Sequence, residues 1–516
     1  MSNLFTPEDL QQLAESGISS ADAQQQLEIL SVPARCRELV RPCTVGDGVL
    51  VLSDGARSRA LEAFDAAREN ISMTKFVPAS GAASRMFQSL QRYHTGSTQD
   101  SSERFAELLS SNDAAALLVK QFFDRLDDFA FVDELETAVA ETGGTLAAWR
   151  QDHRWHDVVR VLLGRGHLDY AHLPKALIPF HRAGSCSRTA LQEHLVEAAL
   201  LLGSPCQVHF TIHPDHEATV REELRVVEPV LKEQYGVRFD VSLSFQEART
   251  MTVALGRDGR PFHRRDGTLL LRPGGHGSLI YNVDQLQASV VLLGNIDNIV
   301  PDHFKQECVD WKKILVGHLL QLREATFEWV CVLRKRAVES KRVDEAAAFA
   351  RDAWNVDIRH VGGTEERRTH LLRALDRPMR VCGVVKNEGE PGGGPFWVAG
   401  ADGPTLQIVE SAEVDMARKE QKAIFDAASH FNPVNLVCSL TDADGNPFEL
   451  GRYVDHGAVF IAQKSEGGAE LLALERPGLW NGAMSHWLTV FVETPISTFN
   501  PVKEVNDLLR EKHQAQ

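Results

Sequence analysis

The middle of the chain alternates between short apolar runs and longer amphipathic stretches. Residues 206–212 are predicted to form a strand, residues 217–235 a helix and residues 237–243 a second strand. An alternation of this kind places successive strands in one sheet, with helices covering its faces. The sequence therefore predicts an α/β fold with a mostly parallel, mixed central sheet, flanking helices and helical insertions.

The length of 516 residues allows two or more domains, or one domain enlarged by insertions. We expect an N-terminal helical preface over residues 1–70 and an α/β core over residues 71–385. Helical periodicity predicts insertions in this core near 88–172 and near 304–375. Glycine, proline and β-branched residues dominate residues 386–516, which are expected to form a β-rich region that completes the core.

Composition excludes several classes of partner. Asp and Glu number 71 against 55 Lys and Arg, and the formal charge of −16 disfavours a nucleic-acid or anionic-membrane surface. The first residues lack the features of a signal peptide, and no later apolar run approaches the roughly 20 residues that span a bilayer. We therefore expect a cytoplasmic protein with no nucleic-acid or membrane partner. Its eight cysteines contain no Cys-x-x-Cys pair, so neither a disulfide framework nor a structural zinc site is expected.

A turn of small residues follows the first predicted strand of the core, residues 75–77. It consists of Ser80, Gly81, Ala82, Ala83 and Ser84, and it ends at Arg85. Small side chains let backbone N–H groups approach an anion, and a helix starting near Ala83 would add the positive end of its dipole. Arg85 would then bind the outer phosphates of a triphosphate. The alternative is an ordinary strand-to-helix turn with a surface arginine, because short glycine motifs are often fortuitous.

Lys175 lies among apolar residues in the segment 173–180. A buried lysine needs an anion, whereas a lysine at a strand edge can cover apolar surface with its stem and keep its ammonium in water. Taken together, the Arg85 turn and this segment resemble the two-part signature of the sugar-1-phosphate nucleotidyltransferases. The two parts lie unusually far apart here, at positions 85 and 175, and the predicted helical insertion accounts for the gap.

Two further segments resemble the eukaryotic-type UDP-N-acetylglucosamine and UDP-glucose pyrophosphorylases. One contains Gln246, and the other contains Gly274, Gly275, His276 and Gly277. The resemblance implies that these residues bind the nucleotide, with Gln246 reading the uracil edge. The glycines would allow the backbone to approach a flat base closely. A plain turn is the alternative explanation for the glycines.

Asp297 follows a predicted buried strand, residues 288–296, in a segment that resembles the Val-Asp-Asn motif of the same enzymes. The carboxyl end of a sheet strand is where an α/β site places a metal ligand. Mg²⁺ prefers one or two carboxylates together with phosphate oxygens. We therefore expect Asp297 to bind Mg²⁺, with an N-cap of the following turn as the alternative.

Similar but weaker resemblances occur in the C-terminal part of the chain. They imply that sugar-binding residues are Glu410, Glu413, Asn432 and Asn435. Lys503 falls in a segment that resembles Phe-x-Pro-x-Lys-Asn, in which the lysine meets the sugar phosphate. Glu504 replaces the asparagine here, and an exposed lysine before a terminal helix is an equal alternative. The whole chain, including residues 477–484, is similar to an uncharacterised bacterial family.

The glycine-rich segment at residues 390–395 is interpreted as a structural connection rather than as a phosphate-binding loop. Residues 390–395 contain glycines that could cradle a phosphate, but they lie between predicted strands at 381–385 and 396–398. A hairpin connection between these two strands is therefore the favoured interpretation.

The resemblance implies a GT-A-like nucleotidyltransferase whose residues 386–516 lie on the substrate side. It would be a Mg²⁺-dependent enzyme that transfers a uridylyl group from UTP to a sugar 1-phosphate, giving a UDP-sugar and pyrophosphate. Its catalytic residues would be Arg85, Lys175 and Lys503. A GT-A glycosyltransferase and a non-catalytic nucleotide-sugar-binding protein are the alternatives. The arginine turn counts against the glycosyltransferase, because a diphosphate sugar has no γ-phosphate to hold.

Overall fold

The computed structural model describes residues 4–32, 36–95, 114–359, 361–390, 392–401 and 403–515. The chain forms two compact units whose segments are interleaved along the sequence. Unit 1 consists of Met1–Thr74, Phe245–Leu293 and Lys312–Ile496. Unit 2 consists of Lys75–Ser244, Gly294–Trp311 and Ser497–Gln516. This division does not follow the three consecutive regions that the sequence predicts.

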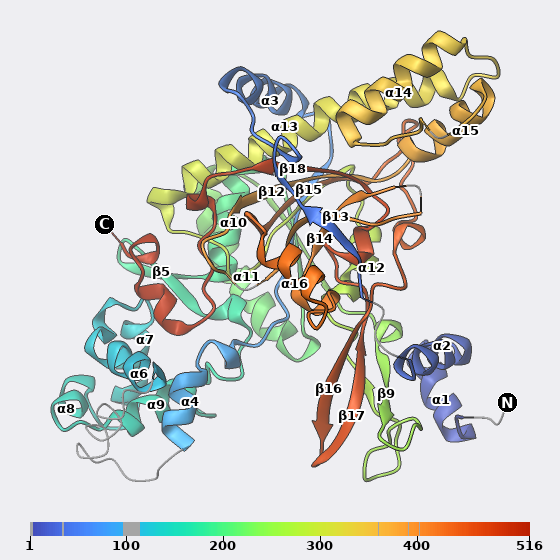
Figure 1. Ribbon diagram of the computed structural model, residues 1–516. Coiled ribbons are helices and arrows are strands. Elements are labelled where there is room, and N and C mark those ends of the chain that lie inside the picture. The colour runs from blue at the N-terminus through green and yellow to red at the C-terminus, as the bar shows by residue number, and fades with distance from the viewer. Residues whose placement is uncertain are drawn as a thin grey trace. The chain divides into compact units, whose positions relative to one another are not determined.

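A large mixed sheet forms the centre of unit 1 (Figure 1). Its strands follow the order β2 (Thr44–Val45), β3 (Gly48–Leu50), β18 (Leu488–Glu493), β12 (Met379–Lys386), β15 (His430–Ser439) and β11 (Val290–Leu293). The pairs β2 with β3, β3 with β18 and β18 with β12 are parallel, whereas β15 is antiparallel to both β12 and β11. Every residue of β15 is buried, so this strand is covered on both faces. The expected α/β fold with a mixed sheet is confirmed.

Two smaller sheets complete the β structure described in unit 1. One has the order β1 (Leu39–Pro42), β13 (Gly394–Val398) and β14 (Thr405–Val409). The other has the order β10 (Leu271–Arg272), β9 (Thr252–Gly256), β17 (Ala469–Glu475) and β16 (Phe460–Glu466), and β9, β16 and β17 form a long arm in Figure 1.

The predicted hairpin around residues 390–395 is wrong. β13 pairs with β1 and β14 rather than with β12, so the glycine-rich segment carries the chain from one sheet to another. The crossing is close, because a Cβ atom at Gly394 would lie 2.7 Å from the carbonyl oxygen of His430 in β15. The local sequence pattern could not reveal this exchange, since the partner strand β1 lies near the N-terminus.

The helices of unit 1 lie in its N-terminal and central segments. They are α1 (Pro7–Glu15), α2 (Ser20–Leu30), α3 (Asp54–Ala67), α12 (Ile280–Asp284), α14 (Ser340–Trp354), α15 (Thr364–Leu375) and α16 (Lys419–Asp426). A further helix, α13 (Asp302–Leu333), starts in a segment of unit 2 and ends in one of unit 1.

The N-terminal region is only partly the helical preface that the sequence predicts. A capping box starts α1, because Thr6 and Asp9 each accept the other's backbone N–H. Apolar residues of α1 and α2, including Leu13 and Leu27, pack against Val253 of β9. Residues 39–50 differ from the expectation, since they form β1, β2 and β3; β1 and β3 pair with strands from the C-terminal half, and β2 pairs with β3.

In unit 2, residues of β4 (Met73–Pro78), β7 (Cys206–Ile212) and β8 (Phe239–Phe245) are neighbours in that order. β5 (Pro179–Ala183) and β6 (Cys186–Thr189) form a hairpin. α10 (Ala190–Leu202) follows β6, and α11 (Glu217–Tyr235) connects β7 to β8.

A helical block occupies the predicted insertion at 88–172, of which residues 96–113 lie outside the described residues. Its helices are α4 (Gln88–Thr95), α6 (Ala114–Asp124), α7 (Val132–Glu141), α8 (Leu146–Gln151) and α9 (Trp155–Leu163). Phenylalanines pack together in its core, where the rings of Phe122, Phe129 and Phe131 are buried and successive centroids lie 4.9 Å apart.

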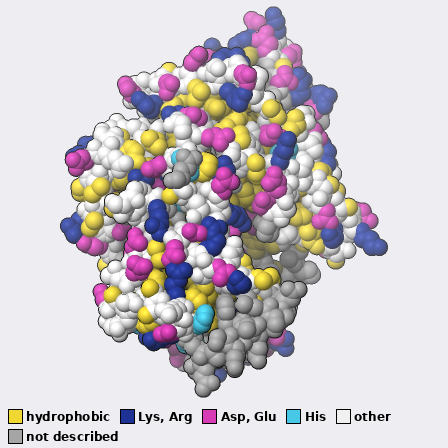
Figure 2. All heavy atoms as spheres, turned by 90° about the vertical axis from the view of Figure 1, so that its left-hand side faces the viewer, with side chains coloured by type: hydrophobic (Ala, Val, Ile, Leu, Met, Phe, Trp, Pro, Cys, Tyr) yellow, Lys and Arg dark blue, Asp and Glu magenta, His cyan; other side chains and the backbone are white. Residues whose placement is uncertain are grey.

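Surface charges of both signs are interspersed on the face drawn in Figure 2. No broad basic patch covers that face, which agrees with the negative net charge. None of the helices within the described residues is both long enough and apolar enough to cross a membrane.

Close helix packing in unit 1 generates a stability prediction. A Cβ atom at Gly317 of α13 would lie 1.7 Å from the carbonyl oxygen of Ala60 in α3. We expect Gly317→Ala to destabilise the protein by about 2 kcal/mol, because the backbones must separate. Gly55→Ala in the exposed first turn of α3 is the control, since its Cβ would meet only Arg59 at 3.5 Å. Calorimetric unfolding should give a lower Tm for Gly317→Ala alone, and equal Tm values would contradict this packing.

Candidate phosphate-binding site

Two lysines from distant parts of unit 2 bind the same carboxylate oxygen. The Nζ atoms of Lys175 and Lys503 lie 3.1 and 3.0 Å from Oδ2 of Asp297. Nζ of Lys175 also donates to the carbonyl oxygen of Val502, at 2.8 Å. The side chains of Lys175 and Asp297 are only 13% and 10% exposed, whereas that of Lys503 is 59% exposed. The cluster is therefore anchored on one side and open to solvent at Lys503.

Backbone hydrogen bonds place Lys175 beside the turn of small residues. Ala82 and Pro174 form an antiparallel bridge. The N–H of Lys175 donates to the carbonyl oxygen of Gly81 at 3.0 Å, and the N–H of Ala83 donates to Leu173 at 2.9 Å. The helical block between positions 85 and 175 thus closes into a loop whose two ends lie together, as the predicted site requires.

The C-terminal segment is attached to the same place. The N–H of Val502 donates to the carbonyl oxygen of Asp297 at 3.0 Å, and Asn298 forms a bridge with Pro501. The N–H of Val505 donates to the carbonyl oxygen of Met86 at 3.0 Å, immediately after the turn. Lys503 is therefore held beside Asp297 by backbone hydrogen bonds as well as by its own side-chain ion pair.

The electrostatics of the cluster follow from burial and from these contacts. Burial by itself would raise the pKa of Asp297, but the charges of Lys503 and Lys175 outweigh it and hold the pKa below the usual value. Burial lowers the pKa of Lys175, and the charge of Asp297 opposes part of that shift. With both lysines charged, the three side chains together carry one net positive charge, and the carboxylate of Asp507 lies close enough to act on Lys175 as well.

The turn itself differs from the expectation in one respect. Ala83–Arg85 form a single 3₁₀ turn, and α4 starts only at Gln88, so no α-helix dipole begins near Ala83. The side chain of Arg85 is exposed and has no hydrogen bond or ion pair to another described residue. Apart from its chain neighbours, no atom of the described residues lies within 4 Å of a Cβ atom built at Gly81, so packing within that part of the chain does not require this glycine. Ser80 and Ala82 are likewise exposed.

Asp297 has one oxygen that fits a metal ion. Its Oδ1 atom is buried and has no hydrogen-bond partner in the described part of the chain. No group of three His, Cys, Asp or Glu side chains suited to a metal occurs among those residues. A single carboxylate oxygen is the kind of ligand that Mg²⁺ uses when substrate phosphates and water complete its shell.

Unit 1 contains the residues that the sequence assigns to the nucleotide base. Nε2 of Gln246 donates to Oγ of Ser278 at 3.2 Å and to Oγ1 of Thr250 at 3.3 Å. The nearby glycines have a reason within the protein. A Cβ at Gly274 would lie 2.4 Å from the carbonyl oxygen of Thr250, and one at Gly277 would lie 1.9 Å from that of Pro477. The close backbone approach that was expected toward a base is made toward protein, and Gly275 has a positive φ of 77°.

His276 joins this loop to one of the predicted sugar-binding acids through a tryptophan. The rings of His276 and Trp480 stack with centroids 4.3 Å apart. Nε1 of Trp480 donates to Oε1 of Glu410 at 3.2 Å. Burial lowers the pKa of His276 to about 4, so its ring is neutral near pH 7. No local sequence pattern assigns Trp480 a role, although its segment, residues 477–484, carries part of the family resemblance.

Glu413 is committed to internal contacts. Its Oε1 accepts from Nε of Arg37 at 3.0 Å, and its Oε2 accepts from Nδ2 of Asn481 at 2.8 Å and from the N–H of Glu410 at 2.9 Å. These contacts support a structural role for Glu413, in which it orients Glu410. Nothing in its local sequence indicated Arg37 or Asn481 as partners.

Asn432 and Asn435 lie on β15 beside an irregularity in its pairing with β12. Oδ1 of Asn432 accepts the N–H of Val434 at 3.1 Å. Val434 has a φ of 61°, which is rare for a β-branched residue and occurs where surrounding structure imposes it. The side-chain amide of Asn435 has no hydrogen bond to any other described residue.

The buried half of the lysine cluster generates a second stability prediction. We expect Asp297→Asn to cost about 3 kcal/mol, because it leaves the ammonium of Lys175 buried without its counterion. Lys503→Gln should cost less than about 1 kcal/mol, since Lys503 is largely exposed. Urea unfolding of wild type, Asp297→Asn and Lys503→Gln measures the two changes in the free energy of unfolding. Equal destabilisation of the two variants would contradict the arrangement.

The pH dependence of this difference follows from the lowered pKa of Asp297. An aspartate with a depressed folded-state pKa stabilises the protein above its unfolded pKa, and that stabilisation disappears as the pH falls through the folded value. The difference in the free energy of unfolding between wild type and Asp297→Asn should therefore reach its full value above about pH 4 and decrease in more acidic solution.

Comparison with solved structures returns pyrophosphorylases at low similarity. A UDP-N-acetylglucosamine pyrophosphorylase from Trypanosoma brucei is 12% identical, with a TM-score of 0.47, over 95% of this chain and 74% of that one. A variant of UDP-glucose pyrophosphorylase from Leishmania major is 12% identical, with a TM-score of 0.43, over 98% and 80%. A putative UDP-N-acetylglucosamine pyrophosphorylase from Entamoeba histolytica is 11% identical, with a TM-score of 0.41, over 90% and 83%.

Comparison by sequence gives a family without an assigned activity. None of the curated proteins matches this chain significantly. A family model described as a domain of unknown function, DUF4301, matches residues 6–514. The chain therefore belongs to the DUF4301 family.

Proposed function

We propose that the protein is a nucleotidyltransferase that joins the α-phosphate of a nucleoside triphosphate to a phosphate monoester and releases pyrophosphate. The observation that carries this proposal is the pair of lysines on Asp297, beside the turn at Gly81. Four segments that are distant in sequence meet there, and each had been assigned to phosphate or metal binding. We further propose UTP and a sugar 1-phosphate as the substrates, from the motif resemblance of Gln246 and of residues 274–277.

The reaction needs cations and positioning rather than a general base. The attacking oxygen of the phosphate monoester is already an anion, and pyrophosphate leaves in line with it. Catalysis then consists of holding two anions that repel each other and of neutralising the charge that develops between them. Lys175 would bind the α-phosphate and the incoming phosphate, Lys503 the phosphate of the second substrate, and Arg85 the outer phosphates of the triphosphate.

Asp297 holds these groups in place in the proposed mechanism. Its Oδ2 orients both ammonium groups, and its buried Oδ1 would hold a Mg²⁺ ion. When bound, that ion would supply further positive charge to the phosphates. Gly81 would leave room for the triphosphate next to the backbone, since no side chain fills that position.

In unit 1, we propose that the loop at residues 274–277 and Gln246 bind the nucleoside, with the neutral ring of His276 contributing to that surface. Glu410 and the asparagines of β15 would bind the hydroxyl groups of the sugar. The carboxylate of Glu410 is held in place by Nε1 of Trp480 and by the backbone N–H of Glu413, with which it forms a capping box. Glu413 would act through Arg37 and Glu410 rather than touch the sugar.

A screen for pyrophosphate release tests the reaction. Purified protein is incubated with each of four nucleoside triphosphates and a panel of sugar 1-phosphates, with Mg²⁺ or with a chelator. We expect release that depends on both substrates and on Mg²⁺, with UTP preferred. Lys175→Ala should lower kcat/KM by about a hundredfold, or about 3 kcal/mol, the scale for one preorganised charge-stabilising group. Lys232→Gln, which changes an exposed lysine on α11, is the matched control.

Other outcomes of the screen would overturn the proposal. Cleavage of a UDP-sugar to UDP, with no pyrophosphate from any triphosphate, would identify a glycosyltransferase. Binding of a UDP-sugar with no turnover under any condition would identify a non-catalytic binding protein. Normal turnover by Lys175→Ala would remove that lysine from the mechanism.

The lowered pKa of Lys175 predicts an alkaline limit on activity. The ammonium must be charged to bind phosphate, so kcat/KM for the free enzyme should fall as the pH rises through a value below 10.5, the ordinary lysine pKa. Lys175→Arg keeps its charge at higher pH, so the fall in its residual activity should move upward. An alkaline limb at the same pH in both proteins would show that another group controls it.

A further inference from the structure

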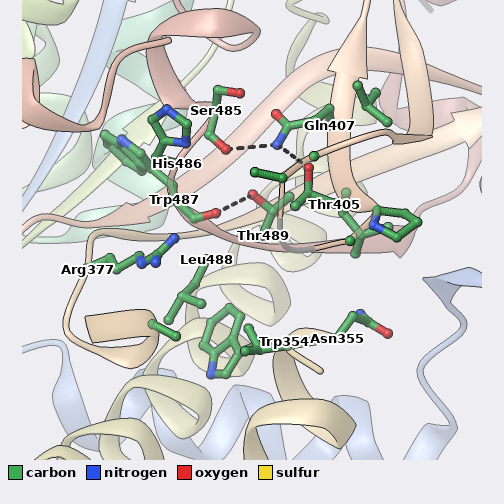
Figure 3. Close-up of a pocket in the computed structure, with 18 of the residues that line it drawn as sticks. Trp354, Asn355, Arg377, Thr405, Gln407, Ser485, His486, Trp487, Leu488 and Thr489 are labelled. Carbon is green, nitrogen blue, oxygen red and sulfur yellow. Dashed lines mark hydrogen bonds between the residues drawn. The ribbon is translucent and has the colours of Figure 1, made fainter. Parts of the chain in front are cut away.

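Unit 1 contains a cavity to which the proposed reaction assigns no substrate, although Arg37, the partner of Glu413, forms part of its wall. It has a volume of about 590 Å³ and is bounded by the ends of α14 and α15, by residues 399–401 and 403–404, and by the residues that lead into β18. Figure 3 shows Arg377 reaching in from one side, with Trp354 and Asn355 below and Thr405, Gln407 and Ser485 above. A cavity of this size is typical of small-molecule sites.

The cavity is remote from the predicted sugar-binding asparagines within unit 1. Arg377 and Leu488 lie where β12 and β18 begin, because Met379 pairs with Leu488. Asn435 pairs with Gly383, farther along β12, and Asn432 comes after Phe431, which pairs with Val385 near the end of that strand. A ligand in the cavity would therefore sit at the other end of β12 from these asparagines.

Arginines provide the positive charge of the cavity wall. Arg373 and Arg377 lie at the end of α15, where Nε of Arg377 donates to the carbonyl oxygen of Arg373 at 3.0 Å. The side chain of Arg373 is exposed and makes no ion pair with any described residue. Of the described acids in the wall, Asp357 pairs with Arg359 at 2.5 Å, and Asp455 shares Arg37, at 3.4 Å, with Glu413. Arg373 is therefore the guanidinium of the described wall that is left for an anion from solution.

Two buried polar groups in the wall lack partners. Nε2 of Gln407 donates to the carbonyl oxygen of Ser485 at 2.8 Å and to Oγ1 of Thr405 at 3.2 Å, which fixes the orientation of the amide (Figure 3). Oε1 of this side chain, which is only 2% exposed, has no partner in the described part of the chain. Nε1 of Trp487 is also buried without a partner there. Unpaired buried polar groups are costly, and a bound molecule can offer them a hydrogen bond.

We propose that this cavity is a second binding site, which takes a small organic anion. Its phosphate or carboxylate group binds Arg373 and Arg377, and its body lies against Trp354, with Gln407 and Trp487 available for hydrogen bonds. The paired acids and the aromatic wall suit a compact molecule with one anionic end and an apolar or planar body.

Titration calorimetry with two aromatic anions tests this site. Phenyl phosphate and benzoate are titrated into the full-length Lys175→Gln variant, in which the proposed phosphate site is weakened, and benzyl alcohol serves as the neutral probe. We expect saturable one-to-one binding of at least one anion, and none of the alcohol. Preference for phenyl phosphate identifies a phosphate ligand, and preference for benzoate a carboxylate.

Substitutions then locate the binding. Arg373→Gln should weaken anion binding at least tenfold, because it removes one of the two guanidinium groups that are proposed to hold the anion. The variant should fold normally, since Arg373 makes no ion pair with any described residue, and circular dichroism checks this. Arg225→Gln is the control, since it changes an exposed arginine on α11 in unit 2. Failure of both anions to bind, or equal binding by Arg373→Gln, overturns the proposal. Neither result affects the proposed nucleotidyltransferase, whose test depends on Lys175 and pyrophosphate release.

Discussion

The shared carboxylate of Asp297 is the interaction on which the candidate site depends. A lysine that is almost buried is costly unless an anion compensates its charge. Asp297 compensates Lys175, and the same oxygen also holds the more exposed Lys503. One carboxylate between two ammonium groups leaves a net positive charge in a partly desolvated place. A phosphate group is the natural complement of that charge.

The backbone makes this cluster possible. Lys175 follows a helical block, Asp297 follows a buried strand, and Lys503 belongs to the C-terminal segment, so side-chain attraction alone would have to order three separate loops. The bridge between Ala82 and Pro174 and the hydrogen bond from Val502 to Asp297 reduce that entropic cost. The site is therefore preorganised, which is what a reaction between two anions requires.

Much of the regular structure could be predicted from the sequence, because its signals are local. The predicted helix at 217–235 and strand at 206–212 match α11 and β7, and Gly236 ends α11 in the left-handed conformation that glycine favours. The strands β1 and β3 and the exchange of β13 between sheets could not be predicted, since they depend on partners hundreds of residues away. The expectation of a helix dipole near Ala83 was wrong for a different reason, because a 3₁₀ turn and an α-helix start with the same local sequence pattern.

The individual residues of the candidate site could be predicted from the sequence, whereas most of their contacts could not. Lys175 and Asp297 could be singled out individually, but no sequence pattern indicates that Lys503 shares the oxygen that binds Lys175. Gly274 and Gly277 were expected to make room for a base, whereas the backbones of Thr250 and Pro477 occupy that room. Trp480 shows what sequence reasoning misses, because its importance comes from stacking on His276 and binding Glu410, and both contacts are tertiary.

Binding of inorganic pyrophosphate tests the central claim most directly, since pyrophosphate needs only the cations and no knowledge of the base or sugar. Titration calorimetry would compare wild type with Lys175→Gln, Lys503→Gln and the control Lys232→Gln. The account predicts that each of the first two substitutions weakens pyrophosphate binding at least tenfold and that the control leaves it unchanged. Undiminished binding by Lys175→Gln and Lys503→Gln would contradict a phosphate site built on Asp297.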